Sequence, residues 1–446
     1  MGQGVNKRAA MFVAVSLQAG CMGSAGDLPF VSRLNSGADA QVSTPQSSAA
    51  LLQTPTNNDE TLNSESSVIQ GLLARKSVLP SGSAYEQVTT SVLAANARAA
   101  ETELRAARLR AEAASKNWLP TIGPSVSLNS LGDIISQIVV EQVIFDNGRK
   151  KGERAFAKAD VEVAAVALAE DTNERVATGL GLYLNAAEGR ETAQLHRVTQ
   201  REMEHFEYIM NERVRGGVSD MSDLNVIRQQ TAEIRASIAA SEETAATALA
   251  ELNAMSIAPQ NDVRGHQTLN ISASEAQPLV VTRANAEKER TIAQSSIDRA
   301  NQLPGIGAQA SIGENGGAGI TAGGANIGFG TSARLKSIEA AKEAAGRVVA
   351  QANEDSNRTL RSLEGRVAST NRQAQEARGL TAQAKTNLDL FREQYEAGRR
   401  PVMDVVGVYE TFAARQNAEI TLKYDALRLQ IELARVQGVL ADGDQI

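Results

Sequence analysis

The amino-acid sequence predicts a mainly α-helical chain with short β hairpins, built by internal duplication. Aromatic residues are only 3% of the 446 residues although 42% are hydrophobic, so the apolar side chains are mostly Ala, Val, Leu and Ile. Small side chains of this kind suit helices that approach one another closely better than they fill a thick globular core. Two proline-free segments of about 67 residues are long enough for helices of roughly 100 Å. The short segments that flank them occur twice, in the same order.

Residues 1–20 have the pattern of an export signal peptide, with Lys7 and Arg8 followed by an apolar stretch and small residues. Cys21 is the only cysteine, so an intrachain disulfide is excluded. Its place resembles the lipidated cysteine of a bacterial lipoprotein; the alternative is a plain cleaved signal peptide with an incidental thiol. Residues 21–82 are rich in Ser, Asn, Gln, Gly and Thr. This composition predicts a low-complexity linker, with room for a short helix at 67–79 and order from about Ser83.

Residues 83–256 form the first predicted repeat. Ile122, Val126 and Leu128 alternate with small or polar residues, which is typical of a strand. Pro120 ends the helix before it, because proline removes a backbone donor and restricts the residue ahead of it. The predicted elements are a helix at 83–118, strands at 122–129 and 136–145, a long helix that reaches residue 215 and a helix at 221–255.

After an irregular segment at 257–271, the same order of elements returns in residues 272–440, and 441–446 are predicted to be a tail. The predicted elements are a helix at 272–302, strands at 305–313 and 320–330, a long helix at 331–397 and a helix at 402–440. The repeats align where Leu119-Pro120 matches Leu303-Pro304, Phe145-Asp146 matches Phe329-Gly330, and Gly217 with Asp223-Leu224 matches Gly398 with Asp404-Val405. Such a repeat means that the fold consists of two copies of one unit.

The lengths of these elements predict how they pair. The helices at 221–255 and 272–302 together have about the length of one long helix, and so do those at 83–118 and 402–440. Two short helices placed end to end can therefore pair along each long one. A coiled-coil seam in the first long helix steps by three and four residues: Val161, Ala165, Leu168, Thr172, Val176, Gly179 and Tyr183. Each strand has about the length, 9–11 residues, that a tilted strand needs to cross a bilayer. Four strands cannot close a barrel and open edges are not tolerated in lipid, so the chain is expected to pool strands with copies of itself. Three copies would give twelve strands, an even number within the known range of barrels.

The chain resembles the TolC family of outer-membrane efflux and secretion channels over about 83–440. The resemblance is carried by the Leu-Pro junctions, by Val143-Ile144-Phe145-Asp146-Asn147-Gly148, and by the turns Arg213-Val214-Arg215-Gly216-Gly217 and Glu393-Gln394-Tyr395-Glu396-Ala397-Gly398. It implies a homotrimer with a twelve-stranded β-barrel in outer-membrane lipid and a long α-helical coiled-coil barrel in the periplasm. It also implies a periplasmic adaptor protein and an inner-membrane pump or ABC transporter as partners. The implied function is passive export, as the exit duct of a tripartite efflux pump or of a type I secretion system.

The resemblance also implies roles for residues of the two helical turns. Gly217 and Gly398 would lie at the periplasmic tips and meet the adaptor. Asp404 would contribute to a ring of carboxylates around a narrowed entrance, which could bind cations and filter solutes. Asp223, Tyr395 and Arg400 would belong to the polar links that hold neighbouring hairpins shut. Among them, Arg400 and Asp223 would form a charge-assisted link that could break when an adaptor binds.

The second turn departs from the family pattern. A second acidic ring, expected one helical turn past Asp404, falls at Gly407, so a weaker or wider constriction is expected. Arg399 and Pro401 also make this turn more basic and stiffer. Only the second repeat carries Tyr395 and Arg400, so the second hairpin is expected to do most of the moving.

Each of these residues also has a purely structural interpretation. Gly217 and Gly398 can end their helices in a left-handed conformation. Asp223 and Asp404 can be favourable charges in the first turn of the next helix. Tyr395 can be a packing aromatic. The sequence leaves these alternatives open.

Other functional classes fit less well. The 45 basic and 52 acidic residues are spread along the chain and give no footprint for nucleic acid. His196 and His205 are nine residues apart rather than four, so they do not place two metal ligands on one helix face. Gly328, Gly330 and Ala333 outline a dinucleotide motif, but no βαβ unit follows.

No combination of Ser, His and Asp or of Cys and His suggests an enzyme, and no cofactor is expected. Two non-enzymatic alternatives remain. A periplasmic adaptor would have one helical hairpin flanked by β-rich halves. A structural coiled-coil lipoprotein would not need strand hairpins at equivalent places in both repeats.

Overall fold

The computed structural model describes residues 66–445, apart from 96–98, 129–133, 270, 272–275, 314–315 and 324–327. Its contacts divide the chain into Met1–Thr54 and Pro55–Ile446, and all described residues belong to the second unit. The predicted signal peptide and the predicted lipidation site at Cys21 therefore lie outside the described residues.

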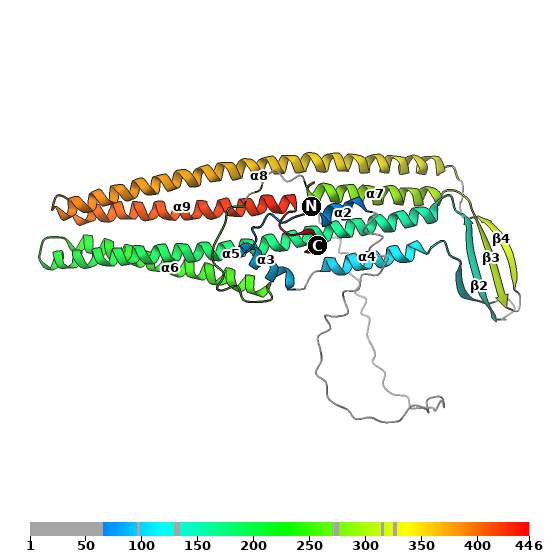
Figure 1. Cartoon of the computed structure of the whole chain (residues 1–446), viewed down its shortest axis with the longest axis horizontal. Helices are drawn as coiled ribbons and strands as arrows, with labels where there is room; N and C mark the ends of the chain where they lie inside the picture. Colours follow the sequence, from blue (N-terminus) through cyan, green and yellow to red (C-terminus); the bar gives the residue numbers. More distant parts are fainter. Residues whose placement is uncertain are drawn as a thin grey trace, which may run out of the picture. The chain divides into compact units, whose positions relative to one another are not determined.

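Helices make up most of this unit (Figure 1). The two long ones are α5, Arg149–Arg215, with 67 residues, and α8, Thr331–Glu396, with 66 residues. The others are α2 (Ser67–Leu73), α3 (Ala84–Ala94), α4 (Ala99–Ser115), α6 (Met221–Ala254), α7 (Leu279–Ala300), α9 (Val402–Gln437) and the 3-10 helix η2 (Gly443–Gln445). Among the described residues, no helix combines the length and the apolar character needed to span a membrane.

Four antiparallel strands form one sheet in the order β1-β2-β3-β4. They are β1 (Thr121–Leu128), β2 (Ile134–Phe145), β3 (Gly305–Gly313) and β4 (Gly317–Gly323). The β2–β3 pair joins the two repeats, with Ile138 opposite Ile312 and Val140 opposite Ala310. The last strand ends earlier than the predicted strand at 320–330. The predicted fold class, long helices with short strand hairpins, is confirmed.

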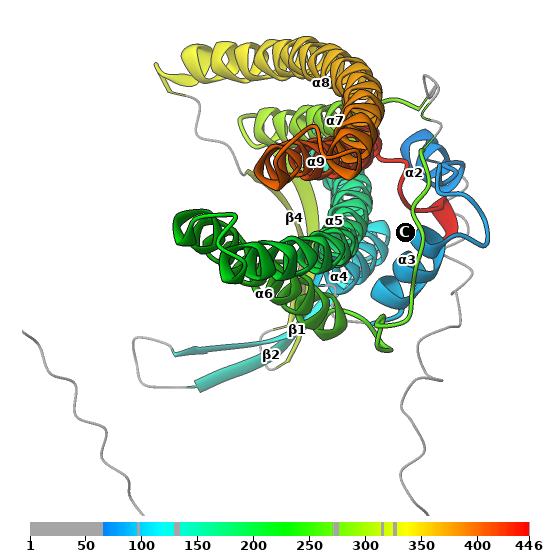
Figure 2. The same ribbon diagram turned by 90° about the vertical axis from the view of Figure 1, so that its left-hand side faces the viewer.

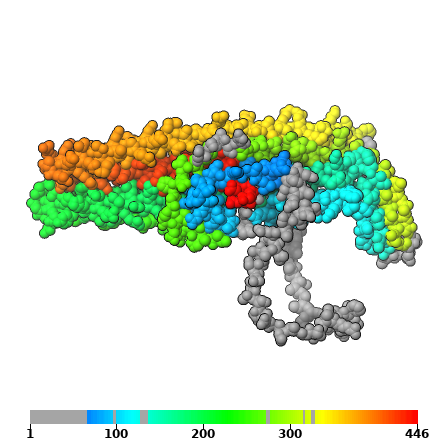
Figure 3. Space-filling view, in the orientation of Figure 1, coloured from blue at the N-terminus to red at the C-terminus, as the bar shows by residue number. Residues whose placement is uncertain are grey.

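The two repeats occupy different positions in the helical layer. Helix α5 packs against α2, α3, α4, α6, α7 and α9, whereas α8 packs against α7 and α9. Figure 2 looks along the helices and shows them as a curved layer, with α6 and α8 towards its two ends and α2 and α3 on the convex side. The space-filling view in Figure 3 shows α8 and α9 running beside α5 and α6 along much of their length. All seven residues of the predicted seam on α5 are buried.

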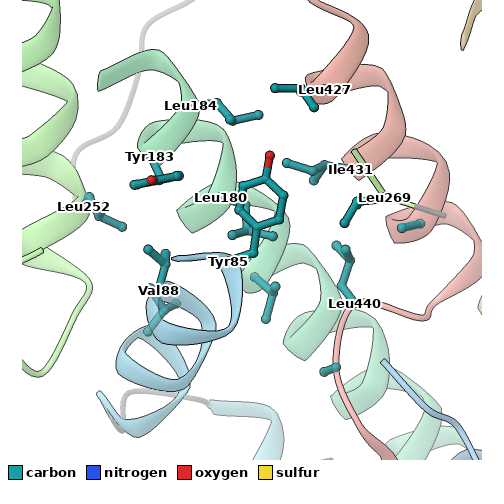
Figure 4. Packing of buried hydrophobic residues seen from close by; sticks show 14 of the residues in the cluster. Tyr85, Val88, Leu180, Tyr183, Leu184, Leu252, Leu269, Leu427, Ile431 and Leu440 are labelled. Atoms are coloured by element: carbon teal, nitrogen blue, oxygen red, sulfur yellow. The ribbon is translucent and has the colours of Figure 1, made fainter. Parts of the chain in front are cut away.

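The main core lies near the middle of α5 (Figure 4). Leu180 and Leu184 of α5 are fully buried there, among side chains from α3, α6 and α9. The rings of Tyr85 and Tyr183 meet edge to face, with centroids 6.2 Å apart. This core therefore joins elements from both repeats.

Two predicted helices are corrected by the structure. The helix predicted at 83–118 is two helices, α3 and α4. Arg175 of α5 explains the break, because its guanidinium donates to the carbonyls of Val92 at 3.0 Å and Ala95 at 3.2 Å, at the end of α3. The helix predicted from residue 272 begins at Leu279, directly after Pro278. Proline suits the start of a helix and disfavours helical backbone just before it.

The segments predicted to be a linker and a tail are also corrected. The short helix for which residues 67–79 had room is present as α2, and Ile69 and Leu72 in it are buried. Order therefore begins by Ser66, not near Ser83. Arg75 is only 7% exposed and donates to the carbonyls of Gln437 at 2.9 Å and Gly438 at 3.1 Å. The residues after α9 bond back to this segment: Ala441 is buried, and the Gly443 amide donates to the Arg75 carbonyl at 3.0 Å. Both segments are thus part of the folded unit.

Candidate functional site

The sheet has two chemically different faces. Strand pairing places Ile122, Pro124 and Val126 of β1 on the same face as Ile138 and Val140 of β2. The β3 and β4 residues on that face are Ala308, Ala310, Ile312, Ala318, Ile320 and Ala322. The opposite face carries Thr121, Gly123, Ser125, Gln137, Val139, Glu141, Gln309, Ser311, Gly319 and Thr321. One face is therefore mainly apolar, although Ser136 and Gln142 of β2 also lie on it, and the other is mainly polar or small.

The apolar face is open to its surroundings. Ile122 and Val126 are each 71% exposed, and Ile320 is 74% exposed. The outer strands β1 and β4 each pair on one side only. Exposed large apolar patches of this kind mark contact with a membrane or a partner, and open edges are ready to pair with further strands.

At the other end of the long helices, the two predicted turns adopt the same geometry. Gly217 has φ +68° and Gly398 has φ +70°. In each turn an amide bonds back across the left-handed glycine, from Val218 to Arg213 and from Arg399 to Gln394, both at 2.9 Å. This pattern satisfies the last carbonyls of a helix. Both glycines are exposed and both end their helices in the left-handed conformation that their structural interpretation predicts.

The Arg400 side chain is engaged within its own turn. Its guanidinium lies 3.2 Å from the Asp404 carboxylate and also donates to the Gln394 side chain. It stacks on the ring of Phe391 at 4.0 Å from the centroid. Asp404 is thus both a first-turn charge of α9 and the partner of Arg400. Within the chain, the predicted link from Arg400 to Asp223 is not formed.

Asp223 and Tyr395 lie in the same region, but neither side chain is a hydrogen-bond or ion-pair partner of Arg400 among the described residues. Asp223 lies in the first turn of α6, as its structural interpretation predicts. Tyr395 is half-buried against an apolar cluster that joins the two hairpins near their tips. The buried members of this tip cluster are Met203, Phe206, Met210, Leu224, Ile227, Leu388, Val402, Val405, Val406 and Tyr409.

Several links between the two hairpins were not predicted from the sequence. Arg392 of α8 pairs with Glu202 of α5 at 2.7 Å, beside Tyr409. Further along α5, Glu188 pairs with Arg428 of α9 at 2.7 Å. A sequence signal existed, since acidic side chains recur along α5 and basic ones along α9, but their partners are more than two hundred residues away in some cases.

A cleft of about 740 Å³ opens between α5 and α9, beside residues 263–266. Glu191 accepts hydrogen bonds there from Lys423 and, at 2.8 Å, from the Tyr424 hydroxyl. Burial alone would raise the pKa of Glu191, but these two hydrogen bonds and the Lys423 charge outweigh it and lower that pKa. The pKa of His266 is also lowered, first by burial and then by Lys423. The cleft therefore holds a charged Glu191 and a neutral His266 near neutral pH.

The described residues contain no cluster of three or more His, Cys, Asp or Glu side chains that could hold a metal ion. Gly328, Gly330 and Ala333 sit where β4 gives way to α8, and the sheet is antiparallel throughout. That arrangement differs from the parallel βαβ unit of dinucleotide-binding folds.

No family model matches the chain, and no curated protein matches it. Among solved structures, a membrane protein from Pseudomonas aeruginosa matches with a TM-score of 0.71 and 16% identity, covering 82% of this chain and 92% of that one. The open state of the MtrE outer-membrane channel from Neisseria gonorrhoeae matches with a TM-score of 0.67 and 14% identity, covering 83% and 95%. The CmeC outer-membrane channel from Campylobacter jejuni matches with a TM-score of 0.66 and 12% identity, covering 80% and 86%.

The chain has the fold of the TolC-type outer-membrane channels. The matches cover most of both chains, so the likeness is not confined to one hairpin. The fold of the single chain that the sequence resemblance implies is confirmed.

Proposed function

We propose that three copies of this chain form an outer-membrane channel that acts as the passive exit duct of an efflux pump or a type I secretion system. The β strands of the three copies close into one barrel in the outer membrane, and the helices continue it into the periplasm. The likeness of the fold to outer-membrane channels supports this proposal.

One observation carries the membrane part of the proposal: the sheet of four strands has an exposed apolar face and two open edges. In lipid the backbone groups at both edges must be paired, so the sheet has to continue into neighbouring copies. Three copies supply twelve strands, an even number within the range of known outer-membrane barrels. The face with Ile122, Ile138 and Ile320 contacts lipid, and the face with Gln137, Ser311 and Thr321 lines the lumen.

We place the contact with a periplasmic adaptor at the turns that contain Gly217 and Gly398. Both turns are exposed and have the same backbone geometry, so six similar loops surround the entrance of a trimer. The adaptor links the channel to an inner-membrane pump or ABC transporter. The conduit itself needs no bound cofactor.

The gate is proposed to involve Asp404, Asp223, Tyr395 and Arg400. Arg400 already holds Asp404 in its own turn, so a link from Arg400 to Asp223 of a neighbouring copy would form by exchange of one carboxylate for another. Pairs of this kind are charge-assisted but exposed, so they are easily exchanged. Opening the gate then costs less free energy than separating a buried ion pair would.

The proposal is tested with full-length protein expressed in cells and recovered from outer membranes. We expect trimers that resist mild heating in detergent and step-like conductance in planar bilayers. Ile320→Lys, on the apolar face, should abolish membrane insertion, because a lysine on the lipid face costs roughly 2–4 kcal/mol at mid-membrane. The matched variant Thr321→Lys changes the adjacent residue on the other face and should insert normally. A soluble monomer from the wild-type chain would contradict the proposal, as would equal insertion of the two variants.

A further inference from the structure

Basic side chains gather where the long helices meet the strands. Residues 149–158, at the start of α5, include five basic residues and one acidic residue, although the whole chain has a net charge of −7. At the start of α8, Arg334 and Lys336 are exposed. Figure 1 shows the starts of both helices beside the same end of the sheet. The four residues Lys150, Lys151, Arg334 and Lys336 are called the collar below.

The collar cations are not explained by interactions within the chain. None of the four forms an ion pair with a described residue. Nearby, Arg299 and Lys342 share the single carboxylate of Glu339, at 3.7 and 3.3 Å. The positive end of the helix dipole disfavours cations in a first turn, yet neither α5 nor α8 has an acidic residue there. At α5 the one nearby carboxylate is that of Asp146, just before the helix, which accepts from the backbone amide of Lys150 at 2.7 Å and leaves the Lys150 ammonium group unpaired among the described residues. At the hairpin tips, α6 and α9 each carry an acidic residue in the first turn.

Exposed aromatic residues lie at the same level as the collar. Trp118 precedes β1, Phe145 ends β2 and Phe329 precedes α8; their exposures are 62%, 54% and 112%. The Asn117 side chain donates to the Lys150 carbonyl at 3.1 Å, which holds the residue next to Trp118 against the collar. Aromatic side chains favour the boundary between lipid and water. Their position therefore marks where the bilayer ends, and the collar lies just on the helix side of it.

The collar also faces outward on α5. Lys151, Lys158 and Glu162 form one stripe along the helix, spaced by seven and four residues, and line a groove of about 600 Å³ against α7. Glu162 accepts a hydrogen bond from Ser66 at 2.8 Å. Ser66 caps α2, which Figure 2 shows on the convex side of the helical layer. Copies that close a tunnel around the concave side leave this stripe on the outside, in reach of lipid.

We propose that the collar binds the phosphate groups of anionic phospholipids in the periplasmic leaflet. The ammonium and guanidinium groups offer charge-assisted hydrogen bonds to phosphate oxygens. A cluster of cations beside a membrane segment is attracted to an anionic leaflet. The inference rests on the proposed membrane function, but it adds a lipid class and the residues that select it. Bound headgroups neutralise the two helix starts and fix the height of the barrel in the bilayer.

Trp118 provides the test, because it is the only tryptophan. Full-length protein is reconstituted in vesicles of phosphatidylcholine with a fixed fraction of either brominated phosphatidylglycerol or brominated phosphatidylcholine, and quenching of Trp118 fluorescence is compared. We expect stronger quenching by brominated phosphatidylglycerol. In the collar variant (Lys150→Gln, Lys151→Gln, Arg334→Gln, Lys336→Gln) this preference should fall, by up to roughly fivefold for each cation removed.

A matched control removes four other arginines of α8 (Arg347→Gln, Arg358→Gln, Arg361→Gln, Arg378→Gln) and should keep the preference. Equal quenching by the two brominated lipids in the wild type would overturn the inference while leaving the channel intact. A preference that inorganic phosphate erases, and that sodium chloride of the same ionic strength does not, would show a site for free anions instead. Absence of quenching by either lipid would mean that the chain does not insert, which is the failure of the proposed function.

Discussion

Helices α5 and α8 occupy equivalent places in the two repeats and have nearly equal lengths, yet their surroundings differ. Of the 67 residues of α5, 24 are buried, whereas 3 of the 66 residues of α8 are buried. Helix α5 packs against six other helices of the chain, whereas α8 packs mainly against α7 and α9 and meets α5 near the tip through the Arg392–Glu202 pair. The two long helices are thus similar in length, but α5 lies at the centre of the subunit and α8 at its edge.

The buried residues of α5 and α8 show this difference in surroundings. The core of α5 contains Leu180, Tyr183 and Leu184, all at most 1% exposed. Helix α8 turns a single row of side chains towards α7 and α9, and only Ser356, Leu363 and Leu388 in it are buried. The rest of α8 is free for a neighbouring copy in the proposed trimer. The first repeat therefore stabilises the subunit, while the second leaves a surface for assembly.

The largest expected effect comes from removing core volume on α5. Leu180→Ala should destabilise the subunit by roughly 2–5 kcal/mol, because a fully buried side chain is lost and a cavity remains. Leu380→Ala on α8 is the control: Leu380 is 47% exposed, and we expect a change within about 0.5 kcal/mol. Denaturant unfolding of the detergent-solubilised protein, followed by circular dichroism, measures both. Equal losses would mean that α8 is as deeply packed in the assembled protein as α5 is within the chain.

A glycine substitution should have opposite signs in the two helices. At Gly189 of α5, an added Cβ would lie 2.8 Å from the Ser241 carbonyl oxygen and 3.0 Å from the Ala245 amide nitrogen, both backbone atoms of α6. Gly189→Ala should therefore cost roughly 1–3 kcal/mol. At Gly346 of α8 an added Cβ meets nothing within 4 Å, so Gly346→Ala should stabilise by up to about 1 kcal/mol through helix propensity. Thermal unfolding of the two variants decides this, and destabilisation by Gly346→Ala would reveal a neighbouring chain at that position.

Much of α5 could be predicted because its pattern is local. The seam from Val161 to Tyr183 repeats every three or four residues, and all its members are buried. The break between α3 and α4 could not be predicted, because it depends on Arg175, which lies eighty residues away from Ala95. The segment around Arg75 was misjudged for the same reason: the carbonyls that Arg75 binds are at Gln437 and Gly438, at the other end of the chain.

In the candidate site, too, features that depend on neighbouring residues could be predicted from the sequence, and features that depend on distant residues could not. Gly217 and Gly398 could be found from sequence, because a left-handed helix end favours glycine at one position. The partner of Arg400 could not be chosen from sequence, since Asp404 and Asp223 were both acidic residues near a turn. The faces of the sheet required the register between β2 and β3, whose residues are far apart in the chain. Without that register, neither the apolar nor the polar face could be assigned.

Substitution of the left-handed glycine should cost the same free energy of unfolding in both turns, although the helices that lead to the two turns differ. Gly217→Ala and Gly398→Ala each place an L side chain at positive φ, with nothing within 4 Å of the new Cβ, so strain is the only cost. We expect about 1 kcal/mol for each. Unfolding free energies measured side by side test this equality. If one variant reduced export in cells far more than the other while both lost the same stability, that turn would be the main adaptor contact.

The smallest expected effect concerns the charged links that tie α5 to α9. The pKa of Glu191 is lowered in the folded chain, because hydrogen bonds from Lys423 and Tyr424 outweigh the effect of burial. A depressed carboxyl pKa adds stability that is complete above the unfolded pKa, near 4.5, and is lost as the pH falls through the lower folded value. Because Glu191 is 38% exposed, solvent screening limits the contribution to less than about 1 kcal/mol.

Glu191→Gln should therefore reduce stability at pH 7 and flatten its decline between pH 5 and pH 3, by about the amount that the carboxylate contributes. The control is Glu364→Gln on α8, whose carboxylate is 45% exposed and lies 3.8 Å from Arg361. Its links join residues of one helix and not two hairpins, so the acid dependence should remain that of the wild type. Thermal melts at half-unit pH steps measure both profiles. An unchanged profile in Glu191→Gln would mean that the link between the hairpins depends on the apolar contacts of α5, and that its charges follow from the packing.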